Sequence, residues 1–505
     1  MERKLSQFLK RQLKPYRHDI TTPLGDHHPE MLSEVKDMLS AIEVKYPSLY
    51  AYEMEMASKV GPLSARKSLK DRMPDILEYY KGIDAAQEPI EPEAIEATSK
   101  FFNIHNLHLY SPEQAYANMP HQTNSGYPNW TKRYKAYELE FPISLSDNGT
   151  IRSNGEIVND YPAILGWRGQ EGGPSLDDTK QRCLFMFPFT YNVLEAQFYQ
   201  PFTIAAQVNG TVPPWNGRHE VDVGVTRLFR STKDPIMCTD FSGYDQHFGK
   251  SVQDATRTLI ASTLRDDEYS RLWLNYIFPI KYNIPLMIST RRTLTGSHGL
   301  GSGSSGTSGD GTIGHKILQF EAALRNGANL NPNSMVLGDD GIITFKGISA
   351  KKVMYSYTNH GMRMNSDKQS ISDEYVIFLR RWHSKRYRSA SGLNVGVYPV
   401  TRAIGRLMHV ERPTDKWTRE DHIMRTLSIC ENFKYHPLRS EVLRYIIQKD
   451  KFRLGLDIPG FIEGLKYKST SDVLQYLNYN QQLEYASSHT GITSWWCIKE
   501  LISML

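Results

Sequence analysis

The sequence predicts an α+β protein in which helices accompany short strands and an antiparallel hairpin. A short apolar segment that ends at Asp240 is typical of a buried strand. Two further apolar segments, 334–338 and 341–345, flank Asp339 and Asp340 and predict a hairpin with a two-residue acidic turn. Helical patterns fill much of the chain between these strands.

Length and composition limit the classes of protein that this chain can be. Its 505 residues are too many for one compact domain and fit about three. The net charge is only +5, so any nucleic acid must be bound by a local basic lining rather than by bulk charge. The four cysteines include no Cys-x-x-Cys pair, which argues against a zinc ribbon, and they indicate no disulfide framework.

The N-terminal part is predicted to be mainly helical. Residues 1–13 carry apolar residues at helical spacing and predict a surface helix, with a membrane or targeting helix as the alternative. Helical patterns continue over 33–100, and the Pro- and Glu-rich stretch 90–97 indicates a linker. Residues 120–180 are rich in Gly, Pro, Asn and Asp, which predicts long loops. We find no apolar run of membrane-spanning length and no signal-peptide core, so we expect an intracellular protein.

Further helices and a strand are predicted around the acidic hairpin. Residues 252–278 predict one long helix, and residues 315–325 predict another that stops at Gly327. After the hairpin, residues 351–359 predict a helix and residues 375–379 predict a strand.

Aspartates at strand ends and turns are the strongest chemical signal. Joining nucleotides requires divalent metal ions on a triphosphate, and two ions roughly 3.5–4 Å apart can hold both the attacking and the leaving oxygen. Magnesium prefers carboxylate and phosphate oxygens. Asp240, Asp339 and Asp340 would supply such ligands if their strands lie side by side. The alternatives are an ordinary Asp-Asp-Gly turn and, for Asp240 and Asp245, surface charges in a loop.

A segment rich in small residues separates the two acidic clusters. Residues 296–314 contain eight glycines, which a flexible linker would also explain. The stretch 301–306 fits the Gly-x-Gly-x-x-Gly dinucleotide pattern, but no apolar strand precedes it and no helical pattern follows it directly. No Gly-Lys-Ser/Thr occurs, so a Walker loop is excluded. The loop instead suits close approach to a template backbone or an incoming nucleotide.

The order of these segments resembles that of viral RNA-dependent RNA polymerases, most closely those of small segmented double-stranded-RNA viruses of the picobirnavirus kind and next the partitivirus kind. The resemblance covers about residues 120–385, and the ordered set of motifs A, B and C is its most specific part. These three motifs are Asp240-x4-Asp245, Gly299-Leu-Gly-Ser302-Gly303-x3-Thr307 and Gly338-Asp339-Asp340.

Four less specific segments also resemble motifs of this family. Motifs G, F, D and E correspond to Thr123-Asn-Ser125-Gly126-Tyr-Pro128, Lys180-Gln-Arg182 with Phe187-Pro188, Gly361 to Gln369 with Lys368, and Phe378-Leu-Arg380-Arg381. The resemblance implies catalysis by Asp240, Asp339, Asp340 and Lys368, metal binding by the first three, nucleotide binding by Lys180, Arg182, Asp245, Ser302 and Thr307, and RNA binding by Thr123, Ser125, Gly126, Pro128, Gly303, Arg380 and Arg381. For the lysines and arginines, exposed loop charges are the alternative.

One position departs from the family pattern. The family usually has Asn four residues after the motif B Thr, where it helps the second motif A carboxylate to recognise the ribose. This chain has Gly311 there. Asp310, Ser308 and Thr307 are the candidates to replace that Asn.

The fold implied by the resemblance is a right-hand polymerase with fingers, palm and thumb, an antiparallel palm sheet backed by helices, and an N-terminal bridge from fingers to thumb. The implied regions are a bridge over 1–99, fingers over 100–234 with an insertion over 280–300, palm over 235–279 and 301–385, and thumb with C-terminal segment over 386–505.

The implied activity is RNA-directed RNA synthesis that replicates and transcribes a double-stranded-RNA genome, with primer-independent initiation. Two Mg²⁺ ions are the expected cofactors, and Mn²⁺ is an expected substitute. Template and product RNA, ribonucleoside triphosphates and a viral capsid protein are the expected partners, with no membrane. The virion interior and the host cytoplasm are the expected locations.

Two other classes of protein remain as alternatives. A reverse transcriptase usually has an aromatic residue where Asp245 lies and Tyr-x before its Asp-Asp pair, and this chain has neither. An RNA-binding capsid or scaffold protein would carry a strong basic tail or patch, against which the net charge of +5 argues.

Overall fold

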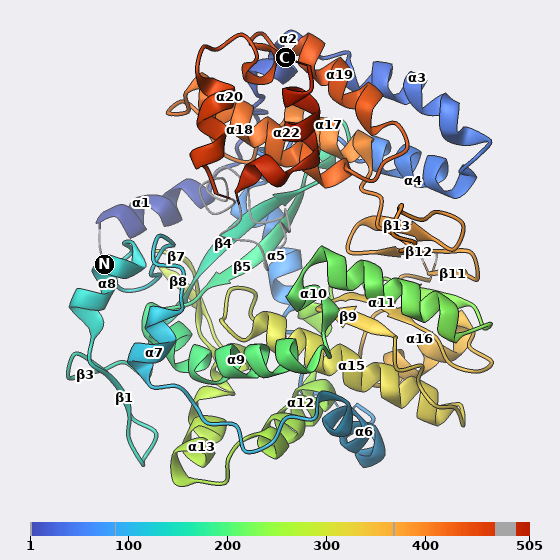
Figure 1. Ribbon diagram of the computed structural model, residues 1–505. Coiled ribbons are helices and arrows are strands. Elements are labelled where there is room, and N and C mark those ends of the chain that lie inside the picture. Colours follow the sequence, from blue (N-terminus) through green and yellow to red (C-terminus); the bar gives the residue numbers. More distant parts are fainter. Residues whose placement is uncertain (1–2, 86, 367–368, 470–490, 505) are drawn as a thin grey trace.

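The computed structural model describes residues 3–85, 87–366, 369–469 and 491–504. It is a mixed α/β structure whose sheets are small and mostly antiparallel (Figure 1). A central four-stranded sheet has the strand order β11 (Ser370–Ser372), β6 (Ile236–Thr239), β10 (Asp340–Ile343), β9 (Met335–Leu337), with every neighbouring pair antiparallel. The strands predicted to end at Asp240 and to flank Asp339 are therefore direct neighbours.

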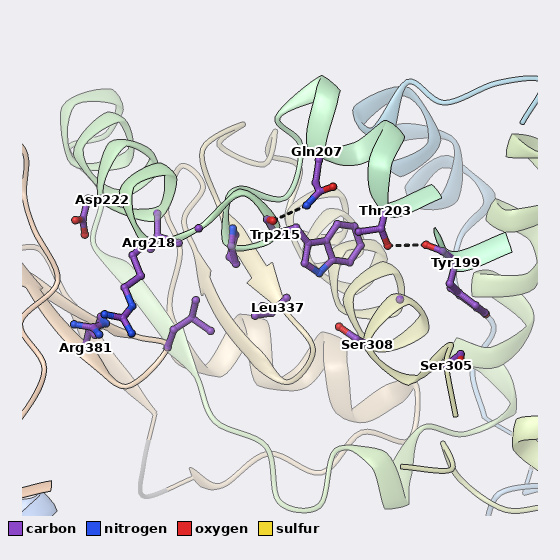
Figure 2. Close-up of a pocket in the computed structure, with 15 residues that line it drawn as sticks. Tyr199, Thr203, Gln207, Trp215, Arg218, Asp222, Ser305, Ser308, Leu337 and Arg381 are labelled. Carbon is purple, nitrogen blue, oxygen red and sulfur yellow. Dashed lines mark hydrogen bonds between the residues drawn. The ribbon is translucent and has the colours of Figure 1, made fainter. Parts of the chain in front are cut away.

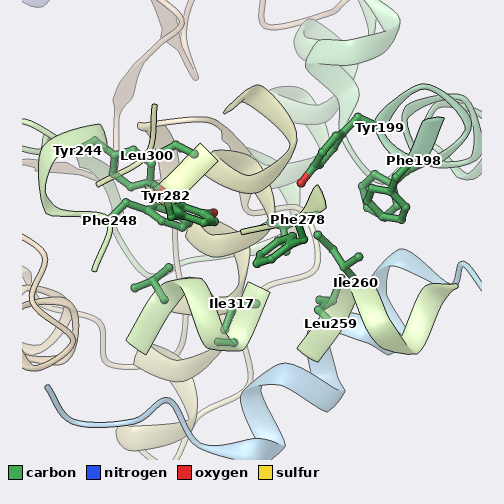
Figure 3. Packing of buried hydrophobic residues seen from close by; sticks show 14 of the residues in the cluster. Phe198, Tyr199, Tyr244, Phe248, Leu259, Ile260, Phe278, Tyr282, Leu300 and Ile317 are labelled. Carbon is green, nitrogen blue, oxygen red and sulfur yellow. The ribbon is translucent and has the colours of Figure 1, made fainter. Parts of the chain in front are cut away.

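Helices α12 (Lys250–Thr263), α15 (Thr307–Arg325) and α16 (Ala350–Asn359) pack with this sheet in the largest hydrophobic core. Figure 3 shows part of that core, in which Phe248, Leu259 and Ile317 pack together. Helix α15 begins before its predicted start at 315. Its first turns carry Gly309 and Gly314 because rings lie too close for a side chain: a Cβ at Gly309 would lie 2.5 Å from the Tyr199 ring.

A long hairpin of β4 (Ala163–Gln170) and β5 (Lys180–Met186) crosses the molecule toward the C-terminal helices (Figure 1). It continues as a four-stranded sheet with β7 (Leu286–Ser289) and β8 (Arg292–Leu294). The expectation of loops throughout 120–180 is therefore wrong for β4. This strand contains Gly169, which resembles a loop signal but is required because the Leu63 carbonyl oxygen would lie 2.0 Å from a Cβ there.

The two ends of the chain share one hydrophobic core. Helices α3 (Met31–Glu43) and α4 (Pro47–Ser58) pack against α17 (Val400–Met408), beside α18 (Arg419–Cys430) and α19 (Arg439–Lys449) (Figure 1). The first helix, α1 (Arg3–Gln12), packs its buried Leu5 and Leu9 against Ile164 of β4, as predicted for a docked surface helix.

Several predicted boundaries differ from the structure. The 252–278 helix is broken: α12 ends at Thr263, and Asp267 caps α13 (Glu268–Leu272) by accepting a 2.8 Å hydrogen bond from the Ser270 amide. The predicted linker over 90–97 contains the start of α6 (Pro92–Phe102), because proline suits the first turn of a helix. The hairpin turn consists of Gly338 and Asp339, since Asp340 already pairs with Leu337.

The remaining elements surround these layers, and the strand predicted at 375–379 is present as β12. They are α2 (Pro23–His27), α5 (Leu69–Glu78), α7 (Pro112–Ala117), α8 (Arg133–Glu140), β1 (Ile143–Leu145), β2 (Ile151–Ser153), β3 (Glu156–Ile157), α9 (Phe189–Asn209), α10 (Pro213–Asn216), α11 (Arg218–Ser231), α14 (Ile280–Asn283), β12 (Tyr375–Phe378), β13 (Arg381–Ser384), α20 (Phe461–Gly464) and α22 (Trp496–Ile502). Among the described helices, none is both long and apolar enough to cross a membrane.

Candidate active site

Acidic residues meet at the end of the central sheet. Thr239 of β6 pairs with Gly341 of β10, so the same register sets Asp240 beside Asp340. Asp240 is exposed just past the strand, and its backbone is fixed by Gln369, whose amide nitrogen donates to the Asp240 carbonyl at 2.7 Å. The Asp240 amide donates back to the Gln369 side-chain oxygen at 3.3 Å.

These carboxyl groups are crowded. Burial and then the Asp339 carboxylate raise the pKa of Asp340 to about 7; Arg380 opposes this rise, and Asp240 adds a smaller contribution to it. Asp339 lies at the exposed tip of the hairpin. The surrounding protein still partly desolvates its carboxyl group, and this desolvation raises its pKa. Arg182 opposes the rise, and Asp245 adds to it. The cluster therefore holds more negative charge than its protein neighbours compensate.

Such a cluster fits a divalent cation that arrives with its substrate. Across the described ranges, no three His, Cys, Asp or Glu side chains are close enough together to form a complete metal site. Magnesium sites in phosphate chemistry usually take one or two carboxylates from the protein and their other ligands from phosphates and water. The paired carboxylates of Asp240 and Asp340, beside Asp339, match that requirement.

We predict that Asp340→Asn stabilises the metal-free protein. An acid whose pKa is raised in the folded state contributes stability at low pH and loses that contribution as the pH rises through the folded value, here about 7. One pKa unit corresponds to about 1.4 kcal/mol, so the substitution should raise the melting temperature at pH 8 by about 3 °C or more. The gain should be smaller at pH 5. Equal melting temperatures for the wild type and Asp340→Asn at pH 8 would contradict the conclusion that the carboxyl groups around Asp340 repel one another.

A cavity of about 400 Å³ opens beside Asp339. Its wall includes Lys180 and Arg182, which lie two apart on β5. Asp245 also lines the cavity, in a short 3₁₀ turn after β6 (Asp245–His247). The cavity thus combines basic side chains for phosphate groups with acidic side chains for a cation or a hydroxyl.

Asp245 is held by two partners from distant segments. Its Oδ2 accepts hydrogen bonds from the Arg182 guanidinium and from the Ser302 hydroxyl. The same carboxylate raises the pKa of Arg182, which is thereby kept fully charged. Ser302 is therefore the motif B hydroxyl that contacts Asp245. The Thr307 hydroxyl instead donates to the Gly301 carbonyl at 2.7 Å.

The candidates for the missing Asn do not replace it. Asp310 is fully buried, and its carboxylate accepts hydrogen bonds from the hydroxyls of Tyr199 and Tyr282. It is therefore not available to a sugar. Ser308 is exposed and lines a different cavity. Among the described hydrogen bonds, none joins Thr307, Ser308 or Asp310 to Asp245, and Ser302 is the hydroxyl bonded to it.

The motif E arginines lie in different surroundings. Arg380 is in the β12–β13 turn, 44% exposed, and its charge opposes the rise of the Asp340 pKa. Arg381 is buried, and its guanidinium donates to the carbonyls of Gly396 at 3.3 Å and Asn432 at 2.9 Å. The expectation that Arg381 follows the RNA backbone does not fit this buried position, because its charge is needed by main-chain carbonyls.

The motif G residues shape a loop. Ser125 is buried and its hydroxyl accepts from the Thr131 amide at 3.1 Å, whereas the Thr123 hydroxyl donates to a carbonyl of the same loop. Gly126 has φ +69° against the Phe187 carbonyl, and Pro128 follows a cis peptide bond. Gly303 of motif B is similarly confined, with φ +119°. Lys368 lies outside the described residues.

A second cavity, of about 350 Å³, lies between α9, α10, α11 and the start of α15. Figure 2 shows Trp215 in the middle of its lining, with Arg218 and Arg381 at one end and Tyr199 and Ser305 at the other. Sequence reasoning missed this cavity because about half of its lining comes from α9, α10 and α11, which carry no motif.

Carboxylates at neighbouring strand ends, beside a cavity lined by Lys180 and Arg182, are the arrangement that a nucleotidyltransferase requires. The model of the viral RNA-dependent RNA polymerase family matches residues 52–447. A potential RNA-dependent RNA polymerase of human picobirnavirus (strain Human/Thailand/Hy005102/-) is 42% identical over 481 residues, which cover 92% of this chain and 90% of that protein.

Solved structures agree with the sequence match. The crystal structure of the RNA-dependent RNA polymerase of a human picobirnavirus matches this chain with a TM-score of 0.93 and 39% sequence identity. The match covers 100% of this chain and 97% of the chain in that structure. An insertion-loop deletion mutant of such an enzyme has a TM-score of 0.91, 38% identity and the same coverage. The chain belongs to the viral RNA-dependent RNA polymerases. It is a homologue of the picobirnavirus enzymes, which the resemblance had predicted.

Proposed function

We propose that this protein replicates and transcribes a viral double-stranded-RNA genome by two-metal nucleotidyl transfer, with primer-independent initiation. The observation that carries the proposal is that the neighbouring antiparallel strands β6 and β10 set Asp240 beside Asp340, with Asp339 in the adjoining turn and next to a cavity lined by Lys180 and Arg182.

The proposed layout is a right hand. Fingers are assigned to 100–234 and 280–300, palm to 235–279 and 301–385, thumb to 386–505, and the bridge to 1–99. The bridge assignment is supported by contacts with both regions. Helix α1 packs against β4 in the proposed fingers, and helices α3 and α4 pack against α17 in the proposed thumb.

The proposed fingers and thumb contact each other directly. Glu171, just after β4, forms ion pairs with Arg402 at 2.9 Å and Arg406 at 2.6 Å on α17. These arginines lower the pKa of Glu171 to about 2 despite its burial. The carboxylate is therefore charged at every working pH, and the hairpin stays attached to the thumb.

In the proposed reaction, the 3′-hydroxyl of nascent RNA attacks the α-phosphate of a ribonucleotide. Two Mg²⁺ ions, or Mn²⁺ in their place, held by Asp240, Asp339 and Asp340, would lower the pKa of that hydroxyl and neutralise the triphosphate. Lys180 and Arg182 would bind the phosphates. Positioning and preorganised charge supply most of the acceleration in such reactions.

Other residues would orient the sugar and finish the reaction. Asp245, together with Ser302, would accept a hydrogen bond from the ribose 2′-hydroxyl. Lys368 would donate a proton to the leaving pyrophosphate. Arg380, on the other side of the carboxylates, would face the product backbone.

The proposed partners are template and product RNA, ribonucleoside triphosphates and a viral capsid protein, and the proposed locations are the virion interior and the host cytoplasm. Base pairing reads the template sequence, so the protein needs only to recognise backbone and shape. This division is consistent with a net charge of only +5.

Incorporation of labelled ribonucleotides on an unprimed single-stranded RNA tests the proposal directly. Product should form with all four ribonucleotides and Mg²⁺. A reverse transcriptase would prefer deoxynucleotides, and an RNA-binding scaffold protein would make no product. Either result would refute the proposed reaction.

Primer-independent initiation should depend on the C-terminal segment. Removing all of 455–505 would be a poor test, because the buried Trp495 and Ile498 belong to the thumb core. Ser469 and Gly491 pair directly, so a short Gly-Ser linker can replace 470–490 and leave both ends in place.

We expect that deletion to lower unprimed synthesis at least about tenfold, a loss of about 1.4 kcal/mol of support for the first nucleotide, and to leave extension of an annealed primer almost unchanged. Replacing 470–490 with an equally long Gly-Ser segment is the matched control for chain length. Equal losses in primed and unprimed synthesis would refute a role in initiation.

A further inference from the structure

The motif B loop that carries Ser302 is anchored from behind by one buried carboxylate. Glu195, in the middle of α9, is fully buried. Its Oε2 accepts hydrogen bonds from the Ser304 hydroxyl at 2.5 Å and the Ser305 amide at 3.0 Å. Both bonds fall within three residues of Ser302, on a helix that sequence reasoning did not connect with the loop.

A buried lysine anchors the other side of the loop. Lys281 of α14 is fully buried, and its carbonyl accepts the Gly301 amide at 3.1 Å. Its ammonium lies 3.9 Å from Glu195 Oε1 and 3.2 Å from Asp310 Oδ2. Burial, with a smaller effect of the nearby Asp310, raises the pKa of Glu195, and the Lys281 ammonium and the hydrogen bonds from Ser304 and Ser305 oppose that rise.

The cluster is completed by aromatic side chains. Asp310 of α15 accepts hydrogen bonds from the hydroxyls of Tyr199 and Tyr282, the second at 2.6 Å. Figure 3 shows Tyr199, Tyr282 and Phe278 among the buried residues of the largest core. Tyr199 also lies against Gly306, where a Cβ would be 2.4 Å from its ring.

We infer that Glu195 and Lys281 are positioning residues for ribose selection: they hold the 301–305 segment so that the Ser302 hydroxyl stays on Asp245. The inference rests on the proposed function, because it assumes that Asp245 and Ser302 recognise the sugar. Neither residue touches the nucleotide. Both act through the backbone on either side of Ser302.

The arrangement explains how this chain recognises ribose without the family's Asn. With Gly311 in that place, Ser302 is the hydroxyl bonded to Asp245. The loop around it carries Gly301 and Gly303, which leave its backbone free to move unless something fixes it. The two hydrogen bonds to the buried Glu195 carboxyl and the bond from the Gly301 amide to the Lys281 carbonyl restrict that freedom.

The test is the ratio of kcat/KM for one ribonucleotide to that for its 2′-deoxy analogue, measured by single-nucleotide incorporation on a primed RNA with the full-length protein. We expect Glu195→Gln to lower this ratio roughly three- to tenfold, since a neutral acceptor holds Ser304 and Ser305 more weakly. The loss should fall on the ribonucleotide, because the deoxynucleotide has no 2′-hydroxyl to misplace.

Glu53→Gln is the matched control. Glu53 is also fully buried, and it also accepts from a hydroxyl and backbone amides at a helix start, those of Val400 and Thr401 on α17. This variant should lose thermal stability but keep the wild-type ratio. If Glu195 had a purely structural role, Glu195→Gln would lower kcat/KM for the ribonucleotide and for its 2′-deoxy analogue by the same factor, and their ratio would not change.

Ser304→Ala removes the hydrogen bond between the Ser304 hydroxyl and Glu195 without changing Glu195. This variant tests the positioning role if the Glu195→Gln protein does not fold. Unchanged ratios in these variants, with a lowered ratio in Asp245→Ala, would overturn the positioning role and leave the proposed function intact. An unchanged ratio in Asp245→Ala would overturn sugar recognition itself, and the positioning role with it.

Discussion

Asp339→Asn and Asp240→Asn should each reduce nucleotide incorporation by at least about a hundred- to a thousandfold, the loss usual when one preorganised electrostatic contact of a transition state is removed. Asp240 follows β6 and Asp339 precedes β10, which is the neighbouring strand, so both place negative charge at the same edge of the sheet. Asparagine keeps the size of the side chain, and RNA binding and the melting temperature should be retained. Single-turnover incorporation on a primed RNA measures the effect.

Asp254→Asn is a suitable control. Asp254 is an exposed carboxylate on α12 that pairs with Lys250 at 2.6 Å, away from the central sheet. Its loss should leave incorporation within about twofold of wild type, as usual for surface substitutions. Near-wild-type incorporation by folded Asp339→Asn protein would remove this cluster from the reaction.

Asp245→Ala should narrow the preference for ribonucleotides at least about tenfold, which corresponds to about 1.4 kcal/mol. A buried acceptor that loses its donor costs about 1–3 kcal/mol, so a deoxynucleotide is penalised only while the carboxylate is present. Because Asp245 also accepts from Arg182, the substitution should slow both substrates as well. The ratio of catalytic efficiencies for one nucleotide and its deoxy analogue separates the two effects.

Arg182→Lys provides the comparison. Lysine keeps the charge beside the phosphates but loses the planar guanidinium that binds Asp245. It should slow both substrates by a similar factor and change their ratio little. If Asp245→Ala kept the wild-type ratio, sugar recognition would pass to Ser302 alone, since Asp310 is buried and bound to two tyrosines.

Sequence alone determined the order of the acidic segments and their local conformation. An apolar segment that ends in Asp240, and two that flank Asp339, specify a strand and a hairpin through short-range patterns. The proximity of Ser302 to Asp245 also followed, because the family resemblance places both segments at one nucleotide. The placements of Lys180 and Arg182 on one cavity wall agree with the same pattern.

Only the tertiary structure decided which polar groups are free and which are bound. Arg182 and Asp245 are 63 residues apart in the chain, and Glu195 and Ser304 are 109 apart. Arg381 looks like a surface charge in sequence but is buried among main-chain carbonyls. Hydrophobic periodicity reports only on neighbours within an element, whereas the cost of a buried charge depends on partners that packing brings from elsewhere. Local sequence patterns therefore predict the acidic residues of the site, whereas the residues that hold them in place are brought together only by tertiary packing.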